Sequence, residues 1–356
     1  MKTLCYIIAV TFIKLIQGQP PEEQDILTPL FHPEICGLQP AIQTDPFTNY
    51  VKEREVVHRG EYPWVVFLEV GHPDWGIGKF TCKGSIISKR FVLTAARCLM
   101  PYRELVNRTN ESIAGLHLSN EFTVDPSMYF SVNFTRSPNV VVRAGETNLK
   151  DVITSCDEMN CPPNVYLSKS VVWYFDDEPP EEGHDVALVE TTKDIVFNDY
   201  VLPICLQPLV AAYNQLYKRD YLGERGIRVT GWGIPSSSDQ FYFKLQKVPG
   251  HIFTEEEIVE FYYKYMTLSF RDVESYVSFF GVGDLSDGLY HDSDIGGPFI
   301  IKKMWEWGRT RYYLYGVYSF MANVSLPPYE TTFVYSRVSH YLDWILENVE
   351  TISRDY

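Results

Sequence analysis

The sequence predicts an all-β protein of antiparallel strands, arranged as a sandwich or as barrels, with a helix at its C-terminus. The first observation is a series of short apolar runs that begins near Val56 and is broken by turn residues. The second is the amphipathic stretch VSHYLDWILENVE at 338–350, which is typical of a helix packed on a core. The third is the length of 356 residues, enough for one large all-β domain or two smaller ones.

The β-like runs follow one another along most of the chain, as strands of an antiparallel barrel or sandwich do. Clear examples are WVVFLEV at 64–70, GSIISKRFVLTAA at 84–96, NVVVRAG at 139–145, DVALVE at 185–190, IRVTGWG at 227–233, GGPFIIKK at 296–303 and YYLYGVYSF at 312–320. A second helix is expected at 254–266, because Thr254 and Glu257 have the spacing of a capping box.

The chain begins with a segment that resembles a secretory signal. Residues 1–18 place Lys2 before an apolar run and end on small or polar residues, so we expect a signal peptide that is removed after Gly18. A membrane anchor is the alternative, but the run is short and Lys14 interrupts it. Residues 19–55 are rich in proline and acidic residues and predict an N-terminal extension before a folded domain at 56–356. The expected location is secreted and extracellular.

Charge and composition limit the classes of partner that the protein is expected to bind. Lys and Arg number 31 and Asp and Glu 46, so the formal charge is 31 − 46 = −15. Such an acidic chain is unsuited to nucleic acid or to anionic membranes, and we expect extracellular proteins as partners. The sequence contains neither a CxxC pair nor an HxxxH spacing, so no metal and no cofactor are expected.

Cysteines and glycosylation sequons agree with secretion. One of the seven cysteines, Cys5, leaves with the signal, and an even number in an oxidising compartment predicts three disulfides. The remaining cysteines are Cys36, Cys82, Cys98, Cys156, Cys161 and Cys205. The sequons start at Asn107, Asn110, Asn133 and Asn323.

Several segments together resemble the trypsin-like serine proteases, and they occur in that family's order. They are GEYPWVVFL at 60–68, FTCKGSIISKRFVLTAARC at 80–98, HDVALVE at 184–190, LPICL at 202–206, VTGWG at 229–233, DSDIGGPFI at 292–300 and FVYSRVSHYLDWI at 333–345. The resemblance implies the chymotrypsin type of fold, a double antiparallel β-barrel with a C-terminal helix. It also implies that Cys82 pairs with Cys98, Cys36 with Cys205, and Cys156 with Cys161.

The resemblance implies a serine that attacks the substrate, a histidine that accepts and returns its proton, and an aspartate that orients the histidine. Asp185 stands at the aspartate position, but Arg97 stands at the histidine position and Ile295 at the serine position. A guanidinium stays protonated and cannot act as a general base, and isoleucine offers no nucleophile. We therefore expect no catalytic residue. Arg97 is expected either to pair with Asp185 or to turn toward solvent.

An active hydrolase with displaced catalytic residues is the alternative. Ser293 lies two residues before Ile295, and His184 and His291 lie near the same segments. A shift of two residues along a tight turn redirects the side chain, which catalytic geometry does not tolerate. Ser293 also replaces a glycine whose N–H helps to bind the oxyanion. We interpret His184 and His291 as ordinary core or loop histidines.

The residues at the activation site and in the specificity pocket also differ from the family's pattern. The family is activated by a cut before an I-V-G-G-like start, whose ammonium group pairs with the aspartate that precedes the nucleophile. Here that start is VKER at 51–54, with Tyr50 before it, so Asp294 is expected to lack this partner. The base of the specificity pocket would be Leu289 and Tyr290 and its wall would include Met321. These bulky side chains are expected to fill the pocket.

The function implied is binding. Inactive homologues of this family in arthropods commonly serve as cofactors, decoys or regulators in extracellular protease cascades such as prophenoloxidase activation and melanisation. The expected partners are therefore cascade proteases or prophenoloxidase. A structural secreted glycoprotein of venom, saliva or reproductive fluid is a further alternative. The extension at 19–55 does not contain the six cysteines of a clip domain, which weakens a direct assignment as a cascade cofactor.

Overall fold

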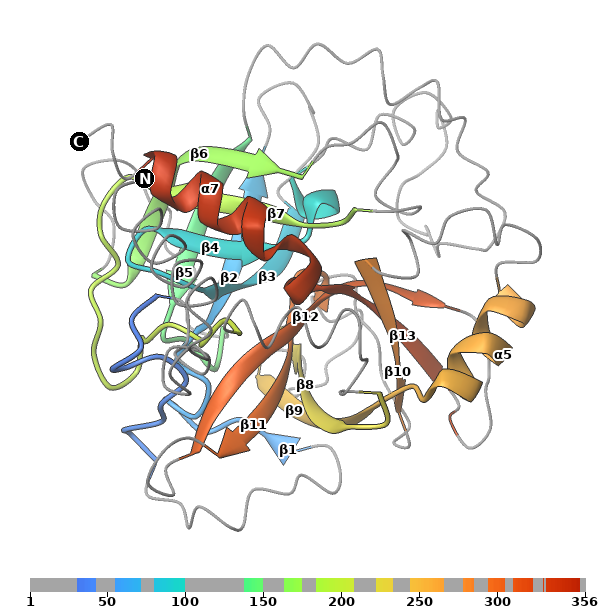
Figure 1. Ribbon diagram of the computed structural model, residues 1–356. Helices are drawn as coiled ribbons and strands as arrows, with labels where there is room; N and C mark the ends of the chain where they lie inside the picture. Colours follow the sequence, from blue (N-terminus) through green and yellow to red (C-terminus); the bar gives the residue numbers. More distant parts are fainter. Residues whose placement is uncertain are drawn as a thin grey trace, which may run out of the picture.

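The structure is a computed structural model, and its described part consists mainly of β-strands, with two α-helices on its surface (Figure 1). It describes residues 31–42, 55–71, 80–99, 138–149, 163–174, 184–207, 222–232, 244–265, 278–284, 294–304, 310–322, 329 and 331–352. All statements about the fold below concern these residues.

The first half of the chain forms a closed antiparallel barrel with the strand order β2-β3-β4-β7-β6-β5. Its strands are β2 (Val65–Gly71), β3 (Phe80–Ile86), β4 (Phe91–Thr94), β5 (Asn139–Ala144), β6 (Val165–Trp173) and β7 (Ala187–Thr191). Val, Ile, Leu and Phe side chains fill this barrel because β-branched and aromatic residues pack well on a pleated surface.

The second half forms another antiparallel barrel, in the order β9-β10-β13-β12-β11-β8, which closes because β8 also pairs with β9. A short strand from the N-terminal side, β1, adds to the edge of β9. The strands are β1 (Glu55–Val56), β8 (Arg225–Gly231), β9 (Leu245–Ile252), β10 (Phe279–Asp284), β11 (Pro298–Met304), β12 (Thr310–Ala322) and β13 (Thr331–Arg337). The expected double barrel is thus confirmed.

Both expected helices are present. In α5 (Glu255–Tyr265), Thr254 and Glu257 exchange the two hydrogen bonds of a capping box: Glu257 Oε2 accepts from the Thr254 N–H at 2.7 Å, and Thr254 Oγ1 accepts from the Glu257 N–H at 3.3 Å. At the C-terminus, a 3₁₀ turn, η7 (Val338–Tyr341), leads into α7 (Leu342–Ile352). Figure 1 shows α5 beside the second barrel and α7 beside the first.

One core cluster spans the two barrels and includes the buried face of α7 through Ile345 and Val349. At the junction, the ring of Trp64, just before β2, lies 5.5 Å from the ring of Tyr312 in β12. The Cys36–Cys205 disulfide ties the described part of the N-terminal extension to this junction. The backbone of Gly37 adds two hydrogen bonds to this connection. Its N–H donates to Pro203 O at 2.9 Å, and its carbonyl accepts from Tyr312 N at 3.1 Å.

Candidate functional site

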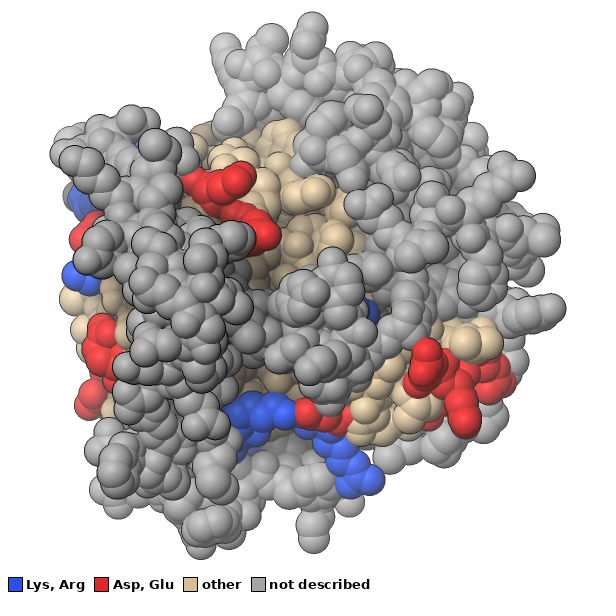
Figure 2. Space-filling model, in the orientation of Figure 1, with Lys and Arg blue, Asp and Glu red and all other residues tan. Residues whose placement is uncertain are grey.

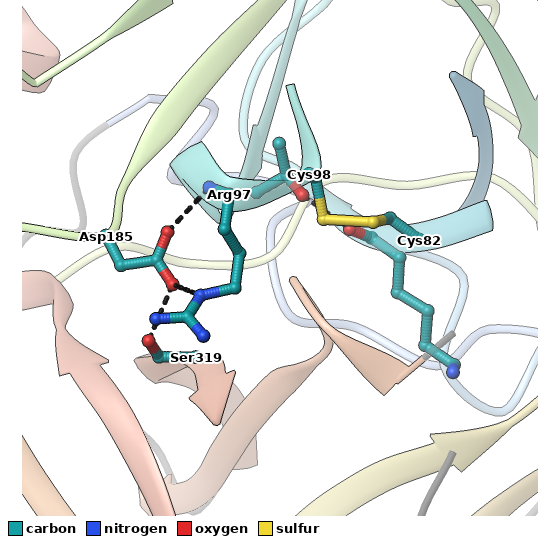
Figure 3. Close-up of a disulfide and its surroundings, with 7 residues drawn as sticks. Cys82, Arg97, Cys98, Asp185 and Ser319 are labelled. Atoms are coloured by element: carbon teal, nitrogen blue, oxygen red, sulfur yellow. Dashed lines mark hydrogen bonds and ion pairs between the residues drawn. A yellow bond between two sulfur atoms is a disulfide. The ribbon is translucent and has the colours of Figure 1, made fainter. Parts of the chain in front are cut away.

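Arg97 lies at the junction of the barrels, in the 3₁₀ turn η1 (Ala96–Cys98) that follows β4. The Cys82–Cys98 disulfide joins this turn to β3 directly beside the arginine (Figure 3). The turn is further closed by Cys98 N, which donates to Ala95 O at 3.2 Å. From this turn the Arg97 side chain points toward Asp185 (Figure 3).

Asp185 precedes β7 and is fully buried. Its Oδ1 accepts from the backbone N–H of Arg97 at 2.8 Å, and its Oδ2 accepts from Arg97 Nε at 2.5 Å and from Ser319 Oγ at 2.6 Å. Ser336 of β13 donates to the Asp185 carbonyl at 2.8 Å. Because the two serines belong to the second barrel, Asp185 connects both halves of the molecule.

The Arg97 side chain is nearly as buried as its partner, with 8% of its surface exposed. Its Cζ lies 5.3 Å from the ring centroid of Phe320, within the range of a cation–π contact. Of the two arrangements expected for Arg97, the structure has the one in which it pairs with Asp185. This geometry is a charge-assisted ion pair in which the cation has no capacity to accept a proton.

Ile295 lies in the turn between Asp294 and β11 and is partly buried against the cores of both barrels. The following residue, Gly296, has φ +81°, a conformation that favours glycine. Its N–H donates to Tyr318 O at 2.8 Å, and Gly297 N donates to Asp294 O at 2.9 Å. Backbone hydrogen bonds thus hold this turn, which presents an aliphatic side chain at position 295.

Lys83, the ion-pair partner of Asp294, is a site residue that the sequence did not reveal. We expected this aspartate to lack the ammonium group of a new N-terminus, and the sequence did not indicate that Lys83 Nζ donates to its Oδ1. Lys83 lies on the same face of β3 as Thr81 and Ser85, a polar pattern that suggests a solvent-facing lysine. It is instead fully buried. No local pattern in the sequence marks this lysine as buried.

The remaining expected residues are distributed as follows. Met321 lies in β12 and is 38% exposed, beside the buried Ser319. His184 is buried and its Nδ1 lies 3.1 Å from the Tyr341 hydroxyl, as a core histidine would be. Outside the described residues lie Ser293, His291, Leu289, Tyr290, Cys156, Cys161, Asn107, Asn110, Asn133 and Asn323.

The described part of the chain contains no group of three or more His, Cys, Asp or Glu side chains that could hold a metal ion. None of its helices is both long and apolar enough to cross a membrane.

Comparison with known proteins places the chain in a family. The family model named trypsin matches residues 51–345. The chain is 28% identical over 321 residues to phenoloxidase-activating factor 3 of Holotrichia diomphalia, covering 88% of this chain and 74% of that protein. It is 28% identical over 298 residues to CLIP domain-containing serine protease B10 of Anopheles gambiae, covering 81% and 67%. It is 25% identical over 291 residues to melanization protease 1 of Drosophila melanogaster, covering 81% and 63%. The protein therefore belongs to the trypsin family.

Proposed function

We propose that the protein is a secreted, non-catalytic member of the trypsin family that acts by binding other proteins in an extracellular protease cascade. The observation that carries this proposal is the ion pair between Arg97 and Asp185, with Nε and Oδ2 2.5 Å apart. The space beside this aspartate holds a guanidinium, where peptide hydrolysis needs a group that accepts a proton from the nucleophile.

The second support is the side chain of Ile295. Acyl transfer requires a nucleophilic oxygen or sulfur at the end of an activated side chain, and isoleucine has neither. The ordered turn at Gly296 and Gly297 retains the backbone frame without a reacting atom. Loss of both proton acceptor and nucleophile removes the whole catalytic unit, because these groups act together rather than independently.

The type of partner follows from the relatives and from charge. Phenoloxidase-activating factor 3 and melanization protease 1 carry names that refer to phenoloxidase activation and melanisation. We propose that this chain binds a protease of such a cascade or prophenoloxidase itself. The net charge of −15 favours a basic partner surface. Glu255, Glu256 and Glu260 of α5 are exposed, and Figure 2 shows acidic side chains gathered at the position of this helix.

A fluorophosphonate probe and a panel of peptide substrates test the absence of catalysis. We expect no labelling and no hydrolysis under conditions in which trypsin reacts. Labelling that disappears in the Ser293→Ala variant would show that the chemistry has moved to that serine and would overturn the proposal.

The binding role is tested separately. The purified protein is added to a phenoloxidase activation assay in arthropod haemolymph, and complexes are isolated by affinity capture from the same fluid. We expect a change in the rate of activation and a stable complex with a cascade protease or prophenoloxidase. If neither occurs and the probe does not label, the protein is a structural secreted glycoprotein instead.

A further inference from the structure

Lys83 and Asp294 form a buried ion pair between the two barrels. Lys83 lies in β3 of the first barrel and is fully buried, and Asp294 begins the turn before β11 of the second barrel and is 5% exposed. Two further groups donate to the carboxylate, Thr230 Oγ1 to Oδ2 at 2.5 Å and the Gly231 N–H to Oδ1 at 2.8 Å. Both oxygens therefore have donors, and Lys83 supplies the positive charge.

Lys83 also holds the turn through its backbone. Its N–H donates to Ile295 O at 2.9 Å, and its carbonyl accepts from Thr94 Oγ1 at 2.6 Å. Gly296 lies so close that a methyl group there would collide with both the Lys83 carbonyl and the Thr94 hydroxyl. One residue of the first barrel thus fixes the turn at 294–297 by side chain and main chain together.

Burial makes this arrangement depend on both partners. Burial lowers the pKa of the Lys83 ammonium, and the charge and hydrogen bond of Asp294 partly offset this effect. A buried ion pair with one partner removed leaves a single charge without compensation, which is far less stable than the pair itself. The conformation of the turn is therefore tied to the presence of the lysine.

We propose that Lys83 is an internal counterion that fixes the 294–297 turn in the uncut chain, so that a proteolytic cut before residue 51 does not change the turn. Such a cut frees an α-ammonium group, but Lys83 Nζ and the Gly231 N–H already occupy Oδ1 of Asp294. A new ammonium would have to displace a lysine that is packed between two barrels. This inference holds whether or not the protein hydrolyses peptides.

Hydrogen exchange at the Gly296 and Gly297 amides, both hydrogen-bonded in the structure, reports on the turn. The full chain carries an added recognition sequence for a specific protease before residue 51, and exchange is measured before and after the cut. We expect the rates to agree within about twofold. In the uncut chain, Lys83→Met should accelerate exchange at least about tenfold. Lys303→Met, which breaks a partly exposed pair with Glu224, is the control and should leave it unchanged.

Slowing of exchange by about tenfold after the cut of the wild-type chain would overturn the proposal, because the turn would then depend on the new terminus. So would unchanged exchange in Lys83→Met. The double variant Lys83→Met/Asp294→Asn keeps the test decisive if the single variant unfolds. We expect it to be more stable than the single variant, because no buried charge remains, and still to exchange faster than wild type at both glycines. A double variant that exchanges like wild type would contradict the role of Lys83.

Discussion

Arg97 reaches Asp185 through two separate hydrogen bonds, from its backbone N–H to Oδ1 at 2.8 Å and from its Nε to Oδ2 at 2.5 Å. Ser319 of the second barrel supplies a further donor to Oδ2. The aspartate that the family resemblance assigns to catalysis is therefore satisfied by donors that hold it in place. Because these donors come from both barrels, we expect Asp185 to stabilise the barrel junction.

The Arg97→Met variant is predicted to be strongly destabilised. Methionine keeps the length of the side chain but leaves the buried Asp185 without a cation, which costs about 3–5 kcal/mol in free energy of unfolding. Chemical denaturation measures this loss. Lys303→Met is the matched control, because its ion pair is partly exposed and should contribute less than about 1 kcal/mol. Equal losses in the two variants would contradict a structural role for the Arg97 pair.

The double variant Arg97→His/Ile295→Ser is predicted to react with a fluorophosphonate probe. Asp185 is already held beside position 97, and the turn at Gly296 is already ordered, so both missing groups would enter a prepared frame. Neither single variant should react, because each lacks either the proton acceptor or the nucleophile. Labelling is followed by mass spectrometry. Equal labelling of Ile295→Ser alone would show that Arg97 is not the group that prevents the reaction.

Gly296→Ala is predicted to cost more than about 3 kcal/mol in the free energy of unfolding. Alanine adds strain at φ +81° and places a methyl group against the Lys83 carbonyl and the Thr94 hydroxyl. Gly223→Ala is a close control, because its φ is +77° but its new methyl group would lie 3.5 Å from the nearest atom, in Thr254. That variant should lose only about 1 kcal/mol, the backbone strain alone. Thermal or urea unfolding of both variants compares the two contributions.

His340 is predicted to reduce stability in acid. Burial, and to a smaller extent the nearby His184 and Arg337, lower its pKa to about 4. The folded state thus favours the neutral ring, so this contribution is constant above pH 6.5 and is lost as the pH falls toward 4. The loss should reach about 2–3 kcal/mol. Urea unfolding between pH 7 and 4 measures it. His340→Gln should remove most of this dependence, whereas the exposed His58→Gln should not.

The fold was predictable because its signals are short-range sequence patterns and the order of the segments along the chain. The capping box at Thr254 and Glu257 depends on residues three apart, and the order of the barrel segments is visible along the chain. Strand β9 has little local signal, because it contains Pro249 and Gly250, which strands usually avoid. Pairing with β8 and β10 on either side forms this strand despite its composition.

The candidate site was predictable in its residues but not in its contacts. Arg97 and Asp185 are 88 positions apart, and whether the guanidinium turned inward depended on burial that no local pattern reports. Lys83 and Asp294 are 211 positions apart. A lysine on a strand normally faces water, so only the three-dimensional packing of the two barrels shows that this one is enclosed.

The Cys36–Cys205 disulfide has a consequence for how processing of this protein must be detected. Its two cysteines are separated by 169 positions, and a cut of the backbone anywhere between them leaves both fragments covalently joined. An intact and a nicked molecule would therefore have nearly the same mass and migrate together on a non-reducing gel. Only reduction of the disulfide would separate the fragments, so samples from body fluid must be compared with and without a reducing agent.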